Sequence, residues 1–158
     1  MNNIKIEIKW AVIFIVMMII WMFIERISGL HDVNIAYHAI FTNFVAIPAI
    51  IIYVLALKDK RNNFYGGVMT YGQGFKCGII ISLIIAIFSP VLQLLISNVI
   101  SPDYFKNAIE YAVQTGVQTR EEAEKYFNLQ SYMIMSAIGS FVMGTITTAI
   151  VAIFMKKK

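Results

Sequence analysis

The sequence is poor in charged residues and in cysteine. Only 14% of its 158 residues are charged, whereas about 25% is usual for a soluble domain. Its one cysteine, Cys77, excludes an intramolecular disulfide and a zinc site built from the cysteines of one chain. The 13 basic residues are scattered between apolar runs and form no stripe, so no nucleic-acid partner is expected.

Apolar residues make up 59% of the chain and gather into four stretches. A helix needs about 20 mostly apolar residues to cross a hydrocarbon core, and uninterrupted runs lack the alternation of a β-barrel strand. We therefore predict an all-α fold, an integral membrane four-helix bundle in which residues 1–158 form a single transmembrane domain. The predicted spans are residues 8–27, 35–57, 77–100 and 129–155.

The lysines and arginines are unevenly divided between the two sides that four spans define. The side with both termini holds nine: Lys5, Lys9, Lys58, Lys60, Arg61, Lys76, Lys156, Lys157 and Lys158. The other side holds four: Arg26, Lys106, Arg120 and Lys125. By the positive-inside rule the nine face the cytoplasm, so both termini are expected there.

The outer loop, residues 101–128, carries helical signals of its own. Ser101 followed by Pro102 is typical of a helix start, and Gly116 is typical of a helix end. The apolar residues between them fall on one face, and Thr119 with Glu122 predicts a second short helix through a capping box. We expect a short amphipathic helical cap that rests on the bilayer or on the top of the bundle. A partner-docking surface or a lid is the functional alternative.

Small residues at four-residue spacing mark packing faces on the last two spans. Helices in a membrane associate through close backbone approach and hydrogen bonds, which small residues permit. The helix-packing candidates are Gly74, Gly78, Ser82 and Ala86 in the third span and Ser136, Ser140, Gly144 and Thr148 in the fourth. We expect the two stripes to face each other; the alternative is that one of them dimerises with a second chain.

Few polar side chains lie inside the predicted spans. His38, Asn43 and Gln93 are candidates for a polar path, and kinks are expected at Pro48 and Pro90, where an amide donor is missing. No charged residue lies at the centre of a span, which disfavours a proton-coupled transporter. Hydrogen bonds between helices are the simpler interpretation of Asn43 and Gln93.

His31 and His38 are seven residues apart, with Glu25 and Asp32 nearby at the predicted outer surface. Such a group could bind a metal or sense pH. It lacks a compact ligand spacing such as His-x-x-x-His, so ordinary interface residues are the preferred interpretation and no metal site is assigned. We also find no nucleophile with a base and no paired carboxylates in a plausible site, and we expect no enzyme activity and no cofactor.

Two short sequence motifs resemble those of a known family. They are Tyr71-Gly72-Gln73-Gly74-Phe75-Lys76-x-Gly78 before the third span and Ser101-Pro102-Asp103-Tyr104-Phe105 after it. Together with the order of elements, they resemble a bacterial membrane family catalogued as domain of unknown function 4199, over nearly the whole chain. The resemblance implies a compact multi-helix inner-membrane protein and carries no known activity or site.

We expect an accessory, interaction or envelope component of the bacterial inner membrane that presents its acidic outer cap to partners. The alternative is a small transporter or channel subunit in which Pro48, Pro90, Asn43 and Gln93 line a passage. The expected partners are the lipid bilayer and either a second copy of the chain or another membrane protein.

Overall fold

The computed structural model describes residues 4–157, and Lys158, one of the basic residues counted above, lies outside them. The described chain is helical apart from turns and one isolated β-bridge. The helices are α1 (Lys5–Ile27), α2 (Ile35–Phe41), α3 (Ala46–Asn63), α4 (Tyr71–Leu95), α5 (Tyr104–Gln114), α6 (Arg120–Tyr126) and α7 (Leu129–Met155). A 3₁₀ segment, η1 (Thr42–Val45), joins α2 to α3, and a π-helical turn, η2 (Ile96–Ile100), follows α4.

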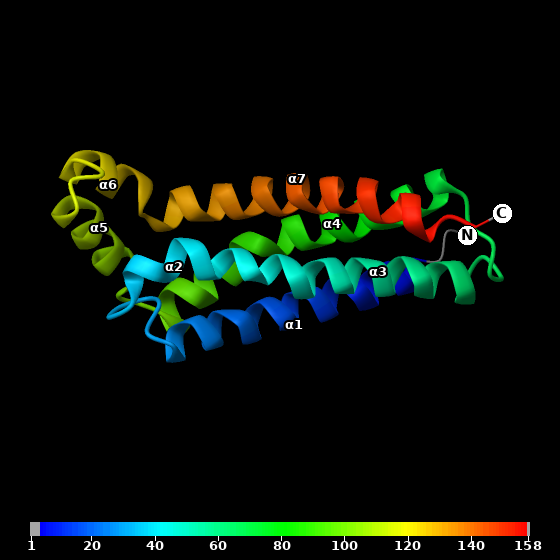
Figure 1. Ribbon diagram of the computed structural model, residues 1–158, viewed down its shortest axis with the longest axis horizontal. Coiled ribbons are helices and arrows are strands. Elements are labelled where there is room, and N and C mark those ends of the chain that lie inside the picture. The colour runs from blue at the N-terminus through cyan, green and yellow to red at the C-terminus, as the bar shows by residue number, and fades with distance from the viewer. Residues whose placement is uncertain (1–3, 158) are drawn as a thin grey trace.

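Four long helical segments lie side by side, and α5 and α6 close one end of the molecule (Figure 1). We call this the cap end, and the opposite end, where α1 begins and α7 ends, the terminus end. Four segments are long and apolar enough to cross a membrane: Lys5–Ile27, Ile35–Asn63, Tyr71–Ile100 and Leu129–Met155. The predicted all-α membrane fold with short helices between the third and fourth spans is confirmed.

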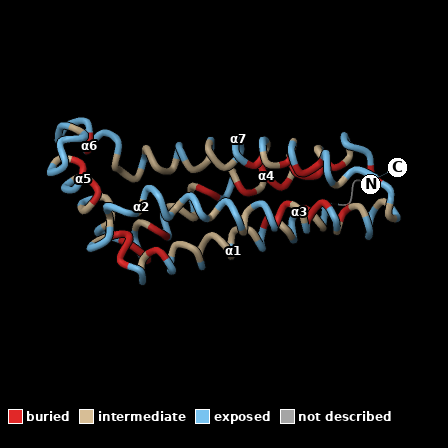
Figure 2. The backbone as a smooth tube through the Cα atoms, viewed as in Figure 1, coloured by how far each residue is buried: buried red, intermediate tan, exposed pale blue. Residues whose placement is uncertain are grey.

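The long helices keep many large apolar side chains on the outside of the bundle. Ile87 is 63% exposed, Ile138 60% and Phe154 72%. Buried positions follow α4 where it faces α7, and gather again at the cap end around the turn between α1 and α2 (Figure 2). A bundle that is apolar outside as well as inside belongs in a lipid bilayer, where outward-facing aliphatic groups need no cover.

The most extensive helix contact joins α4 to α7. Gly78 of α4 lies against Thr148 of α7, and Gly144 of α7 lies against Ser82 and Tyr53, so a Cβ atom at either glycine would overlap these side chains. Ser82 and Thr148 are fully buried.

Two further helix-packing candidates, Gly74 and Ser140, lie along the same contact. Gly74 faces Ala152, and Ser89 hydrogen-bonds to Ser140 at 3.1 Å between their hydroxyl oxygens. Ala86 and Ser136 are half-buried, and the Ser136 hydroxyl donates to the Met133 carbonyl of its own helix.

The two prolines inside the spans have different surroundings. The 3₁₀ segment η1 ends three residues before Pro48, whose missing N–H leaves the Phe44 carbonyl without its usual helical donor. Around Pro90 the α-helix continues to Leu95 and then widens into the π-helical turn η2.

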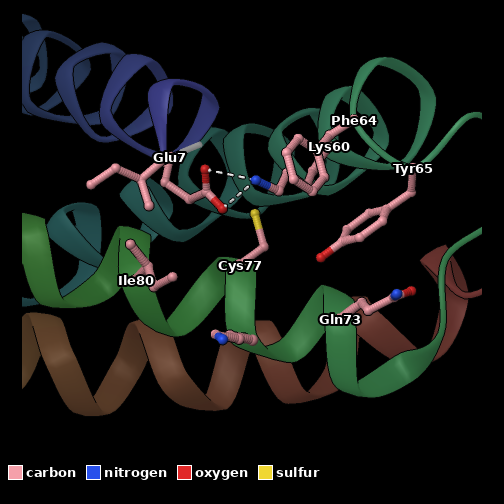
Figure 3. Close-up of a pocket in the computed structure, with 9 residues that line it drawn as sticks. Glu7, Lys60, Phe64, Tyr65, Gln73, Cys77 and Ile80 are labelled. Carbon is pink, nitrogen blue, oxygen red and sulfur yellow. Dashed lines mark hydrogen bonds and ion pairs between the residues drawn. The ribbon is translucent and has the colours of Figure 1, made fainter. Parts of the chain in front are cut away.

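A buried ion pair joins α1 to α3 near the terminus end (Figure 3). The Lys60 ammonium lies 2.8 Å from one carboxylate oxygen of Glu7 and 3.1 Å from the other. Both residues are buried, and the Lys60 ammonium also lies 3.8 Å from the centre of the Phe64 ring. Cys77 of α4 points toward the pair and is itself buried. This ion pair and the antiparallel bridge between Met69 and Lys157 fix the terminus end.

Replacing the glycines at the α4–α7 contact is expected to destabilise the bundle. Gly144→Ala and Gly78→Ala each force an extra methyl group into an occupied space, at a cost of about 1–3 kcal/mol. We expect a lower midpoint of thermal unfolding in detergent, followed by circular dichroism. Gly139→Ala, also in α7, is the matched control because its Cβ would contact nothing and alanine favours a helix. Equal midpoints for all three variants would contradict the packing.

Breaking the buried ion pair on one side is expected to cost more than removing it altogether. Lys60→Met leaves the Glu7 carboxylate buried without its cation, which typically costs about 3–5 kcal/mol. The double variant Glu7→Gln with Lys60→Met removes both charges and should recover much of that loss. Thermal unfolding of the two single variants and the double variant measures the coupling, and additive losses would show that the pair does not interact.

Candidate functional site

Three side chains meet at the cap end: Glu25, His31 and His38. Glu25 lies in the last turn of α1, His31 in the turn that follows, and His38 in α2. The turn places them through Gly29, whose φ of +73° is left-handed and whose N–H donates to the Arg26 carbonyl. The next N–H, of Leu30, donates to the Glu25 carbonyl, which completes a Schellman ending of α1 and folds the chain back over Glu25.

One carboxylate oxygen of Glu25 faces both imidazole rings. The Nε2 atom of His31 lies 3.2 Å from Glu25 Oε2, and the Nε2 atom of His38 lies 3.4 Å from the same oxygen. Glu25 and His31 are almost completely buried, whereas the His38 side chain is 19% exposed. The other oxygen of Glu25 accepts a hydrogen bond from the Trp21 indole N–H at 2.6 Å. Each polar atom of this carboxylate therefore has a specific partner.

Residues at the beginning of the cap contact the two histidines. His31 Nδ1 lies 2.5 Å from the Ser101 hydroxyl, and the Asn107 side-chain amide donates to the His31 carbonyl at 2.9 Å. His38 Nδ1 lies 3.4 Å from the Tyr104 hydroxyl, which lies at the same distance from the Tyr132 hydroxyl of α7. The site thus joins α1, α2, the beginning of the cap and α7.

Two groups next to the site have shifted pKa values. Burial raises the pKa of Tyr104, so its phenol stays protonated and neutral. The backbone N–H of Val33 and then the Arg26 guanidinium lower the pKa of Asp32. Asp32 accepts from that N–H at 2.6 Å and forms an ion pair with Arg26. Its carboxylate is therefore engaged outside the cluster, although its neighbour in sequence, His31, lies inside it.

The arrangement can bind a cation or share a proton. Glu25, His31 and His38 each offer one ligand atom, and these three atoms lie within 4.8 Å of one another. Two imidazoles and a carboxylate form a common ligand set for transition metals. A groove of about 610 Å³ runs beside Glu25 on the side of α1 and α2. It is lined by Trp21, Ile24, Glu25, Ser28, Leu30, Asn34, Tyr37 and Phe41.

The three residues of the predicted polar path have separate partners. His38 belongs to the cluster with Glu25. The Asn43 amide is exposed and donates to the Ala39 carbonyl of its own helical segment at 2.6 Å. The Gln93 amide donates to the Ser97 hydroxyl one turn further along, at 2.9 Å.

The prediction that Ser101 caps the first cap helix is wrong. That helix, α5, begins at Tyr104 with Asp103 as its N-cap residue, while the Ser101 hydroxyl is used by His31. The predicted end at Gly116 is confirmed by its left-handed φ of +70°, and the capping box of Thr119 with Glu122 is confirmed at the start of α6.

Several site residues could not be found from the sequence. Nothing in the sequence connects Ser101, Tyr104 and Asn107 to a histidine 66 or more positions away. Trp21 is typical of a membrane interface, but the four-residue spacing to Glu25 would have placed the two side chains on one helix face.

Comparison with known proteins identifies the family alone. No curated protein matches the chain, and no solved structure matches it. The model of a family described as a protein of unknown function (DUF4199) matches residues 9–157, nearly the whole chain. The chain, with its four candidate membrane spans and its helical cap, therefore belongs to the family DUF4199.

Proposed function

We propose that this protein is a non-enzymatic accessory component of the bacterial inner membrane that works by interaction through its cap, residues 101–128. The observation that carries the proposal is that the cap is a folded element fixed to the bundle. Contacts of Ser101, Tyr104 and Asn107 with the two histidines attach its first part, and Ala108, Ala112 and Ala123 are buried. A rigid, attached element outside the spans can present one surface to a partner at low entropic cost.

The charge of the cap favours a partner segment that carries basic residues. Acidic side chains outnumber basic ones on it: Asp103, Glu110, Glu121, Glu122 and Glu124 against Lys106, Arg120 and Lys125. All of these residues are exposed. The backbone N–H and hydroxyl of Thr119 lower the pKa of Glu122, which keeps its carboxylate ionised.

The placement of the remaining reactive groups supports a role without catalysis. The one thiol, of Cys77, is buried beside the Glu7–Lys60 ion pair, where it has little access to a substrate. The cap carboxylates begin α6 or lie along exposed faces, where they interact with water and helix termini.

The basic residues support an orientation with the terminus end in the cytoplasm. Lys58, Lys60, Arg61 and Lys76 all lie at or near the loop between α3 and α4, next to the ends of α1 and α7 (Figure 1). A concentration of lysine and arginine in short loops is typical of the cytoplasmic side.

Reporter fusions test this orientation. Alkaline phosphatase requires disulfides and is active only outside the cytoplasm, whereas green fluorescent protein fluoresces inside it. We expect a fluorescent C-terminal fusion, and an active phosphatase when it is inserted at the exposed turn around Gly116. An active phosphatase at the C-terminus would reverse the orientation.

Site-specific photo-crosslinking in living cells tests the interaction. A photoreactive residue at Val117, which is 76% exposed on the cap, should give a discrete adduct with another envelope protein. The same residue at Ile138, which faces outward from α7, is the control and should give none. Reversing two cap charges, with Glu121→Lys and Glu124→Lys, should reduce the adduct at least about fivefold, because complementary charge governs such encounters.

Two outcomes would contradict the interaction role. An equal adduct from Ile138 would show unspecific proximity in the membrane. A solute flux in proteoliposomes that Gln93→Leu abolishes, together with no adduct from the cap, would favour the transporter instead.

A further inference from the structure

We propose that Glu25, His31 and His38 bind a divalent transition-metal ion, for which Zn²⁺ is the best fit. The proposal goes beyond the interaction role and does not depend on it, because metal binding can be measured on the purified chain alone. It depends on the distances between the ligand atoms, on the hydrogen bonds behind them and on the burial of the carboxylate.

The distances match the edges of a tetrahedral coordination shell. Zinc binds histidine nitrogen and carboxylate oxygen at about 2.0–2.1 Å, so neighbouring ligand atoms around a tetrahedral ion lie about 3.3 Å apart. The two edges from Glu25 Oε2 measure 3.2 Å to His31 and 3.4 Å to His38. The third edge, between one ring nitrogen of each histidine, is no longer than 4.8 Å. A small rotation of His38, the most exposed of the three side chains, closes it.

The hydrogen bonds behind the histidines orient the correct nitrogen atoms. A metal-binding histidine commonly donates its second ring N–H to a nearby oxygen, which leaves a lone pair on the binding nitrogen. Here Ser101 and Tyr104 lie next to the Nδ1 atoms of His31 and His38, and both Nε2 atoms lie within 3.4 Å of Glu25 Oε2. The Trp21 indole occupies the other oxygen of Glu25, so Oε2 is the one left for an ion.

The chemistry of the ligands selects among metals. Mg²⁺ and Ca²⁺ prefer shells of oxygen atoms, whereas two imidazoles with one carboxylate suit Zn²⁺ and its transition-metal neighbours. The fourth position would hold water. The groove beside Glu25 gives a path to the site, and the charge of a cation offsets that of a carboxylate which is only 1% exposed.

Metal binding would also strengthen the attachment of the cap. The three ligands come from α1, the turn after it and α2, and the residues that orient them belong to the beginning of the cap. An ion that binds only the assembled site stabilises that assembly by mass action.

Metal titration of the purified protein tests the proposal. The chain is prepared in detergent with a tag that contains no histidine and is stripped with a chelator, and Zn²⁺ is then titrated against a fluorescent competitor. We expect one Zn²⁺ per chain and a higher midpoint of thermal unfolding, with no effect of Mg²⁺. His38→Gln and Glu25→Gln should each weaken binding at least about 100-fold, and Ser101→Ala about 10- to 100-fold.

Asp32→Asn is the matched control, since Asp32 lies beside His31 in sequence but its carboxylate is bound to Val33 and Arg26. It should bind Zn²⁺ as the unmodified chain does. Equal affinity of the His38→Gln variant, or no binding to the unmodified chain at tens of micromolar Zn²⁺, would overturn the proposal.

Cobalt substitution decides the matter if the variants fail to fold. The chain has two histidines and both lie in the cluster, so any imidazole bound to the metal must come from this site. The unmodified protein loaded with Co²⁺ should show the visible absorption of a tetrahedral complex and X-ray absorption from two imidazoles. A spectrum of an octahedral aqua ion would overturn the proposal.

Discussion

The structure depends on the close approach of α4 and α7. Lipid is as apolar as the side chains of these helices, so exclusion from water cannot hold them together. Gly78 and Gly144 remove the side chains that would separate the two backbones, and the space is filled by Thr148 from one side and by Ser82 with Tyr53 from the other. The hydroxyls there are satisfied locally: Thr148 donates to the Gly144 carbonyl at 2.7 Å, and Ser82 pairs with Tyr53 at the same distance. Around this contact the other spans can keep large aliphatic residues outward.

The lipid bilayer also explains where the charged groups lie. A charge in the middle of a bilayer is costly, and the buried charged residues of the described chain lie near the two ends of the bundle. At the terminus end Glu7 is compensated by Lys60. At the cap end Glu25 is compensated by the Trp21 indole and two imidazoles, with no lysine or arginine in the cluster. These two ends are therefore chemically different. The Glu7 carboxylate is already paired with an ammonium and has little to offer a further cation, whereas the Glu25 carboxylate faces two imidazole rings, which are themselves metal ligands.

The cap and this cluster form one unit. Ser101 illustrates the point, because its local sequence is typical of a helix start, yet its hydroxyl contacts His31 and the helix begins at Tyr104. A buried imidazole nitrogen without a partner would cost more than a solvent-exposed helix terminus that water can satisfy. The position of the cap is thus tied to the side chains of the turn after α1 and of α2, and the interaction surface that we propose lies on that cap.

The sequence by itself determined the lipid environment, the helical class, the order of the elements, the capping box at Thr119 and the family. These follow from run length, composition and local capping, which are properties of residues that neighbour one another in the chain. The sequence placed His31 and His38 near Glu25 but could not give their geometry. Only the tertiary structure placed Ser101, Asn107 and Tyr104 in contact with those histidines and Gly144 in contact with Ser82. It also paired the Asp32 carboxylate with Arg26, outside the cluster. These contacts join residues far apart in the chain or select between neighbouring partners. Each is decided by how whole helices pack, which local patterns do not encode.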